Sequence, residues 1–392
     1  MKRERHNYDE KEEDRLGDLP ECVLLHLLSF LTAKEAVQTC ILSTRWKNLW
    51  KHLPIVRISS SYFNTMDGFT EFIAQFLSLR DDSTALDHLL FNSEGMVEPQ
   101  ILERILKYAV SHNVQQLLIV LNYNIEHIPS CIFSCLTLTS LKLVSHHNGT
   151  LFPNSLNLPA LSTLYLLGFV FCSHNDDRAE PFSALKKLNS LTIWLCEVDD
   201  AQNLCISNVT LANLAIQTNQ RWNYCKIELC TPNLSKFAYA GTALEKLSGS
   251  HLCSIKHIII DAYMCSNNAQ PPSNLLNWLR AFTKLISLTV TSTTLQVLSL
   301  YPNILKVKHH CLRNLKLLRV NMEGISSGPS NTLADGIFLN MSVRCQEEFA
   351  KFREEIFKKG FPATLKEMVG FLLQNSQSAK IQIISSYIGR KM

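Results

Sequence analysis

The sequence lacks an unbroken apolar run long enough to cross a membrane. No stretch approaches the roughly 18 consecutive apolar residues that a spanning helix needs. A strong excess of one charge is missing too: the formal net charge is only +4, and the basic residues are scattered along the chain. Such a chain shows neither a nucleic-acid footprint nor a membrane footprint. We therefore expect a soluble protein that binds no nucleic acid and no membrane.

Motifs that carry enzyme chemistry are also missing. There is no Gly-x-Ser-x-Gly elbow, no Walker loop, no Gly-x-Gly-x-x-Gly and no His-Glu-x-x-His. The close pairs Cys131 and Cys135, and Cys225 and Cys230, do not have the two-residue spacing of zinc ligands, and no second pair lies at the usual distance. We therefore predict a non-catalytic protein with no metal and no cofactor.

The cysteines do not form a recognisable disulfide framework. There are 13 of them, an odd number with irregular spacing, and no secretory leader precedes the first apolar segment. A reducing compartment, the nucleus and/or the cytoplasm, is the expected location. With 46% hydrophobic and 18% charged residues, the 392-residue chain has material for a small domain and one large core. Residues 1–14 are almost wholly polar and are expected to form a disordered tail.

The first apolar segment, residues 15–54, is predicted to form short helices. Pro20 suits a first helical turn, where its missing N–H would have no partner anyway. Apolar residues then recur at three- and four-residue steps. Thr32 and Glu35 have the spacing of a capping box, which predicts the start of a second helix. Ser43 is placed to cap a third helix.

The third predicted helix carries Trp46 and Trp50 on one face, because residues four apart are neighbours on a helix surface. Some forty residues cannot easily bury that much apolar surface alone. The segment therefore predicts a partner surface, although each apolar side chain could instead belong to the core of a three-helix bundle.

This segment closely resembles an F-box, the domain that docks onto the Skp-type adaptor of SCF ubiquitin ligases. The resemblance is carried, in order, by Leu-Pro, the apolar helix, Thr-Ala-Lys-Glu-Ala-Val, Leu-Ser-x-Arg-Trp and a second Trp. It implies a set of adaptor contacts or their immediate support: Leu19, Pro20, Leu24, Leu28, Val37, Leu42, Trp46 and Trp50. Among them we expect Leu19, Pro20 and Leu24 to be direct contacts, and the tryptophans to join the F-box to the following repeats.

Beyond the F-box-like segment the sequence becomes periodic. Motifs of leucine, any residue and an apolar residue recur at intervals of 24, 23, 27, 23, 23, 21, 30 and 27 residues. Short alternation predicts a strand, and this spacing is typical of leucine-rich repeats, which bury their apolar faces by stacking. The predicted strand centres are Leu89–Phe91, Leu117–Ile119, Leu141–Leu143, Leu164–Leu166, Leu191–Ile193, Leu214–Ile216, Phe237–Tyr239, Ile258–Ile260, Leu288–Val290 and Leu315–Leu317.

Residues between the apolar positions of these motifs are predicted to point away from the core. Lys142, Tyr165, Thr192 and Thr289 are examples. Together they define the expected surface for reading a target. The copies near residues 230–270 match the pattern least well.

Helical patterns flank and interrupt the repeats. We expect a helical cap or linker over 55–84, an outer repeat helix over Pro99–His112, and a loop with an amphipathic helix over 321–364 that could be an insertion. Residues 365–392, with a helix at Leu365–Leu373 and a strand at Lys380–Ile384, resemble the C-terminal FBD region of plant F-box proteins. The expected domains are 1–14, 15–54, 55–84, 85–320, 321–364 and 365–392.

The resemblance as a whole is to plant F-box/leucine-rich-repeat/FBD proteins. It implies an α/β fold: a three-helix F-box, a solenoid of parallel strands with helical or irregular returns, and an FBD-like cap. It further implies a substrate-recognition subunit of an SCF ubiquitin ligase, bound to a Skp-type adaptor and, through it, to a cullin, with the repeats holding a target protein. The alternative is a binding module that holds the adaptor without a cullin and acts by sequestration or scaffolding.

Overall fold

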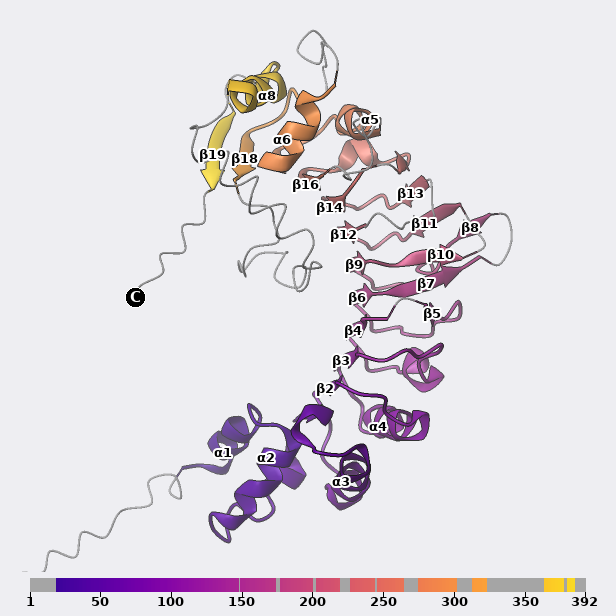
Figure 1. The fold of residues 1–392 in the computed structure, drawn as a ribbon, viewed down its shortest axis with the longest axis vertical. Coiled ribbons are helices and arrows are strands. Elements are labelled where there is room, and N and C mark those ends of the chain that lie inside the picture. Colours follow the sequence, from indigo (N-terminus) through magenta and orange to yellow (C-terminus); the bar gives the residue numbers. More distant parts are fainter. Residues whose placement is uncertain are drawn as a thin grey trace, which may run out of the picture. The chain divides into compact units, whose positions relative to one another are not determined.

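The computed structural model describes residues 19–147, 149–173, 177–199, 202–218, 226–243, 245–263, 274–301, 312–322, 363–376 and 379–384. The chain divides into two compact units, Met1–Ile119 and Val120–Met392 (Figure 1). The predicted N-terminal tail, and residues 323–362 of the segment predicted to hold a loop and an amphipathic helix, lie outside the described residues. In the parts of the chain that are described, no helix has the length and apolar character required to cross a membrane.

The first unit is mainly helical. Its α-helices are α1 (Glu21–Leu28), α2 (Ala33–Gln38), α3 (Met66–Leu79) and α4 (Pro99–Ser111). Short 3-10 turns occur at η1 (Thr39–Ile41), η2 (Leu49–His52) and η3 (Ser60–Tyr62). The strands β1 (Ile55–Ser59), β2 (His88–Ser93) and β3 (Gln116–Leu121) are neighbours, in that order, in one sheet. The predicted starts of the first two helices are confirmed, and so is the outer helix, now α4.

The third predicted helix of the F-box-like segment is not a regular helix. Residues 44–48 form turns, and only Leu49–His52 has helical 3-10 geometry. The backbone bonds span three residues: the N–H of Trp46 donates to Ser43 at 3.1 Å, and that of Leu49 donates to Trp46 at 3.3 Å. Trp46, Leu49 and Trp50 are all buried. Tertiary packing of these side chains outweighs the weak helical preference of so short a segment.

The segment predicted as a helical cap holds a helix and an unexpected strand. The helix is α3, with Phe69, Ile73 and Phe76 buried on one face. The strand is β1, which pairs in parallel with β2 so that Val56 lies opposite Leu89. β1 was missed because it lacks the leading leucine and its Val56 lies 33 residues before Leu89, a longer interval than any between the predicted motifs. The array therefore begins one strand earlier than predicted.

The second unit has a long main sheet. Its parallel strands lie in the order β4 (Ser140–Ser145), β6 (Thr163–Leu167), β9 (Ser190–Trp194), β12 (Asn213–Gln217), β14 (Lys236–Gly241), β16 (His257–Ala262), β17 (Ser287–Thr291), β18 (Leu317–Asn321) and β19 (Lys380–Ile384). Among the described residues of this unit, the α-helices are α5 (Asn274–Ala281), α6 (Ser292–Ser299) and α8 (Ala363–Leu373), and short 3-10 turns occur at η4 (Ser130–Ser134) and η5 (Leu252–Ser254). The FBD-like helix and strand predicted from the sequence correspond to α8 and β19.

The core of the second unit is a stack of the predicted apolar positions. In each main-sheet strand from β4 to β17 the two predicted residues are at most 2% exposed, including Phe237 and Ile258 in the copies that match the pattern least well. The register aligns them across neighbouring strands, so that Leu141 lies opposite Leu164 and Leu164 opposite Leu191. This alignment lets each strand bury a face that it could not bury alone.

The returns between the main strands are partly strands rather than helices or irregular segments. One small sheet has the order β10 (Glu197–Asp199), β7 (Phe169–Cys172), β5 (Thr150–Phe152). A second has the order β15 (Lys246–Ser248), β13 (Lys226–Cys230), β11 (Asn203–Ser207), β8 (Arg178–Ala179). Figure 1 shows these short strands on the side of the second unit opposite to its main sheet. Phenylalanines of these returns pack against one another: the Phe152 ring lies 5.7 to 6.1 Å from those of Phe133, Phe169, Phe171 and Phe182.

The last leucine-rich motif was predicted three residues too early. Leu318 and Val320, not Leu315 and Leu317, lie opposite the inward residues of β17. Leu315 is buried too, but it precedes the strand, as Leu285 precedes Leu288. The sequence offers overlapping leucine patterns here, and the pairing with β17 selects one of them.

Candidate functional site

Both ends of α1 are fixed by hydrogen bonds. The carbonyl of Pro20 accepts from the backbone N–H groups of Val23 and Leu24 at 2.9 and 3.2 Å. At the other end, the hydroxyl of Ser29 donates to the carbonyl of His26 at 2.6 Å. Proline fits the start of a helix because the N–H that it lacks would have no partner within the helix there. The helix is therefore a well-defined platform for the side chains that it displays.

α1 has apolar residues on its buried face and on its exposed face. Leu24 and Leu28 are buried. A second set, Pro20, Val23, Leu27 and Phe30, is spaced at steps of three, four and three residues, and we call it the α1 stripe. Val23 is 36%, Leu27 41% and Phe30 64% exposed, and Pro20 is exposed as well. Exposed apolar side chains grouped in this way are typical of protein interaction sites.

A second exposed apolar group lies just after α2. Ile41 is 85% and Leu42 62% exposed, and we call them the η1 pair. The turn that carries them is held to α2 by the hydroxyl of Thr39, which donates to the carbonyl of Ala36 at 2.7 Å. The backbone that carries these two exposed side chains is therefore held in place by α2.

The capping box at the start of α2 is present as predicted. The backbone N–H of Glu35 donates to the hydroxyl of Thr32 at 3.3 Å, and the backbone N–H of Thr32 donates to the Glu35 carboxylate at 2.9 Å. The Glu35 carboxylate accepts from the Thr32 N–H and also from the Thr32 hydroxyl, and these two bonds favour its ionised form, so the pKa of Glu35 is lower than usual. The box sets the point at which the chain leaves α1 and enters α2.

The structure divides the predicted adaptor residues into exposed and buried ones. Pro20 and Leu42 are exposed, Leu19 and Val37 are half-buried, and Leu24, Leu28, Trp46 and Trp50 are buried. The carbonyl of Leu19 accepts a hydrogen bond from Arg45. Because Leu24 has no exposed surface, it supports α1 from within in this structure, and its direct contact with an adaptor stays a prediction. Binding of the adaptor by the whole set stays a prediction.

The predicted adaptor residues leave out four of the exposed apolar ones: Val23, Leu27, Phe30 and Ile41. The signal for the α1 residues was present, because a helix that is apolar on all sides and begins a small domain must expose one side or bury it on a partner. Which side faces solvent depends on packing within the unit. The structure alone identifies the stripe.

Trp50 forms the expected joint with the following helix. Its ring stacks on Phe76 of α3, with centroids 5.4 Å apart and planes 26° apart. Phe76 in turn stacks on Phe72 at 5.5 Å. Trp50 therefore packs on the helix that lies between β1 and β2 in the chain.

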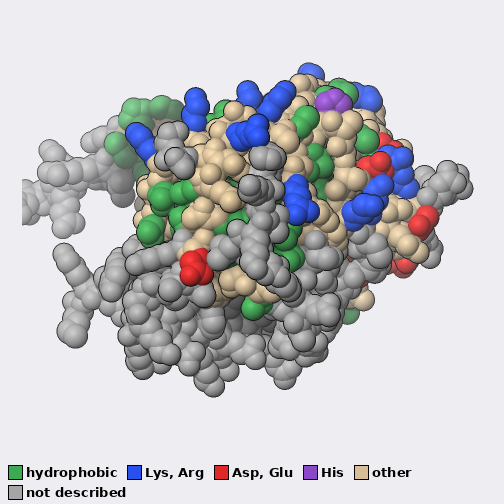
Figure 2. Space-filling view, turned by 90° about the horizontal axis from the view of Figure 1, so that it is seen from above, with side chains coloured by type: hydrophobic (Ala, Val, Ile, Leu, Met, Phe, Trp, Pro, Cys, Tyr) green, Lys and Arg blue, Asp and Glu red, His purple; other side chains and the backbone are tan. Residues whose placement is uncertain are grey.

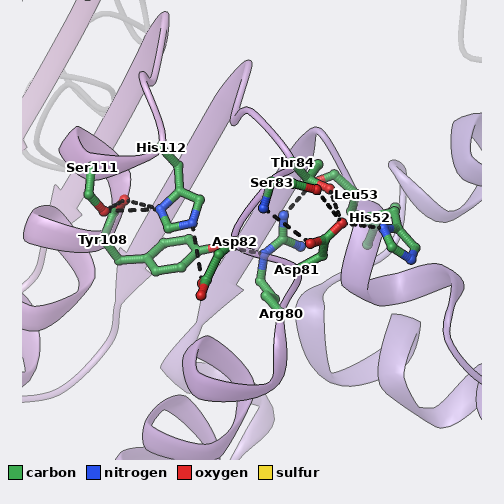
Figure 3. A network of polar contacts seen from close by, with 10 residues as sticks. All are labelled: His52, Leu53, Arg80, Asp81, Asp82, Ser83, Thr84, Tyr108, Ser111 and His112. Carbon is green, nitrogen blue, oxygen red and sulfur yellow. Dashed lines mark hydrogen bonds and ion pairs between the residues drawn. The ribbon is translucent and has the colours of Figure 1, made fainter.

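Arg80 extends this joint as a buried cation (Figure 3). Its guanidinium donates to the carbonyl of Trp50 at 3.1 Å, to that of Leu53 at 2.6 Å and to the hydroxyl of Tyr108 at 2.8 Å. The planar guanidinium suits three acceptors in different directions, which the point charge of a lysine does not. Arg80 therefore ties the end of the F-box-like segment to α4.

Asp81, next in the chain, organises the neighbouring turn. Its carboxylate accepts from the N–H of Ser83 at 3.1 Å and lies 3.0 Å from the Nδ1 atom of His52. Hydrogen bonds from Ser83 lower the pKa of Asp81 to about 2. Figure 3 shows His52 and the turn beside Arg80, so the joint is polar as well as aromatic.

The outward face of the main sheet carries a second apolar cluster. It comprises Val144, Tyr165, Leu167, Trp194 and Ala215, all buried. Lys142 lies over the Tyr165 ring with its ammonium 4.4 Å from the centroid, and Trp194 lies 5.5 Å from the same ring. Burial lowers the pKa of Lys142.

Tyr165 is therefore not an exposed reading residue, contrary to the prediction, because these neighbours cover it. Lys142, Thr192 and Thr289 are only half-buried.

The described residues offer no metal centre, since no three His, Cys, Asp or Glu side chains among them converge. No disulfide joins the nine cysteines in the described part of the chain.

Comparison with known proteins identifies the domain that carries the two exposed apolar groups. Residues 16–58, which include the α1 stripe and the η1 pair, match the F-box domain family. An F-box protein of Arabidopsis thaliana is 25% identical over 304 residues, which cover 75% of this chain and 74% of the relative. Two F-box/FBD/LRR-repeat proteins of the same plant are 24% and 26% identical over 300 and 339 residues. These matches cover 74% and 80% of this chain, and 64% and 73% of the relatives.

Proposed function

We propose that this chain, a plant F-box/FBD/LRR-type protein, is the substrate-recognition subunit of an SCF-type ubiquitin ligase. F-box proteins are in general non-catalytic substrate receptors, and F-box domains in general bind Skp-type adaptors. The further parts of the proposal are that this F-box holds such an adaptor, that a cullin joins through it, and that the repeats bind a target protein.

The α1 stripe is the observation that supports adaptor binding most directly. Full burial of a large apolar side chain is worth roughly 1.5–3 kcal/mol, so covering a half-exposed one contributes roughly 1 kcal/mol. An adaptor that covers both the stripe and the η1 pair would gain roughly 5 kcal/mol from Val23, Leu27, Phe30, Ile41 and Leu42. That is a factor of about a thousand or more in affinity.

The proposed mechanism is positioning rather than chemistry. A target held on the repeats and an enzyme carrying ubiquitin held through the adaptor and cullin would meet at a high effective concentration. The encounter then becomes intramolecular, which removes much of the entropic cost of bringing the reactants together. No catalytic group of this chain is required.

The α1 stripe can be tested by charge substitution. We expect Val23→Glu combined with Leu27→Glu to weaken binding to a purified Skp-type adaptor by about a hundredfold or more, since two carboxylates would have to be buried without partners. The matched control is Leu79→Glu, a substitution of an exposed leucine on α3 outside residues 16–58. It should bind like the parent chain.

Circular dichroism melting of each variant separates loss of binding from loss of folding. If the double variant is folded and still binds the adaptor with unchanged affinity, the assignment of the stripe is wrong. Adding a cullin to the complex tests the next step. Adaptor binding without cullin assembly would favour the sequestering module over the ligase subunit.

A further inference from the structure

Lysines gather at one end of the strands in the second unit. Lys236 and Lys380 are the first residues of β14 and β19, and Lys256 and Lys316 immediately precede β16 and β18. All four are exposed, and we call them the lysine row. In Figure 2, Lys and Arg side chains line the upper edge of the view, and Asp and Glu are sparse among them.

The main-sheet ladder holds the backbone of the row in register. The N–H of Ile286 donates to the carbonyl of Lys256 at 2.8 Å, that of Lys316 to Ile286 at 2.9 Å, and that of Lys380 to Lys316 at 2.9 Å. Lys236 lies opposite His257, the residue after Lys256. Neighbouring strands lie about 4.8 Å apart, so four strand intervals from β14 to β19 span roughly 19 Å.

The charges of the row are not neutralised within the described residues. None of the four lysines forms an ion pair there. Of the five main-sheet strands from β14 to β19, only β16 contains an acidic residue, Asp261. Its carboxylate is buried at the other end of the strand and accepts from the hydroxyls of Thr291 and Thr293.

The pKa of His257 is affected by the cations around it. Its pKa is lowered, first by burial and then by Lys236, Lys256 and Arg319. The cations are therefore close enough to act together.

We propose that the lysine row receives an extended, carboxylate-rich segment of the target protein. This inference rests on the proposed function, in which the repeats hold the target, and it adds the chemistry by which the target would be recognised. An extended chain advances about 3.3 Å per residue, so about six residues cover the row.

The strands that carry the row favour an acidic peptide over nucleic acid. Of the five main-sheet strands from β14 to β19, only β14 contains Phe, Tyr or Trp, and its Phe237 and Tyr239 are both buried. Tyr165 and Trp194, the aromatic residues of the outward-face cluster, are buried, so that cluster presents no open ring on which a base could stack. A run of Asp and Glu therefore matches the row best.

The test uses the full chain in complex with its adaptor and a fluorescent peptide of about ten residues rich in Asp and Glu. Anisotropy should show binding that weakens as salt rises, because exposed charges are screened. Lys256→Glu combined with Lys316→Glu should weaken it about tenfold or more. The control is Arg104→Glu with Lys107→Glu on exposed positions of α4, which changes the net charge equally.

Several outcomes would overturn the inference. These are a peptide affinity unchanged by the row variant, equal binding of a peptide with Asn and Gln in place of Asp and Glu, tighter binding of a single-stranded oligonucleotide, or displacement of the peptide by inorganic phosphate at a similar charge concentration. Adaptor binding is measured on the same samples. Loss of the peptide with the adaptor retained locates the failure in the row, whereas loss of the adaptor would count against the proposed function.

Discussion

Arg80 offers the sharpest test of how the F-box is joined to α4. The substitution is Arg80→Met, which keeps much of the apolar stem and removes the guanidinium. Three acceptors then lose their donor: the carbonyls of Trp50 and Leu53 and the hydroxyl of Tyr108. Leaving a buried polar group unsatisfied costs about 1–3 kcal/mol.

The expected loss is smaller than the simple sum. Three unsatisfied acceptors would cost about 3–9 kcal/mol, but the variant no longer has to bury a charge, which offsets part of the cost. We therefore expect the first unit to lose about 3 kcal/mol of its free energy of unfolding. Arg80→Lys should not restore it, because one ammonium cannot reach all three acceptors.

Hydrogen exchange read by mass spectrometry measures this locally. A loss of about 3 kcal/mol corresponds to about a hundredfold faster exchange of the protected amides of residues 21–59. The control is Arg104→Met, since Arg104 is exposed and donates to the carbonyl of Ala74 at 3.2 Å. If Arg80→Met exchanges at the same rate as Arg104→Met and the parent chain, the Arg80 guanidinium does not hold the joint and the reasoning fails.

Three further predictions concern other features. Thr32→Ala should cost about 1 kcal/mol in thermal melting through loss of the α2 cap; an unchanged melting temperature would refute the role of the box. Gly168→Ala should lower the free energy of unfolding of the second unit in urea by roughly 2 kcal/mol or more, because its φ is +78° and a Cβ would clash with the carbonyl of Ser145. Gly370→Ala is the control and should leave the free energy of unfolding unchanged, because no atom lies within 4 Å of the added Cβ. Burial raises the pKa of Glu245, which accepts from the hydroxyl of Tyr239 at 2.8 Å. Stability should therefore fall as pH rises above the ordinary value of 4.5, and Glu245→Gln should flatten that dependence and raise stability at pH 7; a profile that keeps the parent slope would refute it.

Local rules in the sequence were sufficient for several elements. Pro20 marks the start of α1, Thr32 and Glu35 form the box that begins α2, and Pro99 starts α4. These signals succeed because the hydrogen bonds or backbone angles involved lie within a few residues of each other. The strand centres from Leu89 to Val290 were likewise readable, since each repeat places its own inward pair by alternation.

The errors arose where distant contacts decide. Residues 44–48 give up helical geometry so that Trp46, Leu49 and Trp50 can pack inside the first unit. β1 exists because β2 offers a parallel partner. At β18 the sequence contains two overlapping leucine patterns, and only pairing with β17 selects the inward Leu318.

The motifs were enough to identify an F-box followed by stacked repeats, because those patterns are local and recur. Which apolar and charged side chains stay exposed depended on tertiary packing. The α1 stripe became visible once packing had buried Leu24 and Leu28 on the other side of the helix. The lysines at 236, 256, 316 and 380 are scattered in the sequence, and the parallel register places them at one end of a single sheet. Register turns separation along the chain into spacing of a few ångströms, so a surface charge pattern emerges only from the fold.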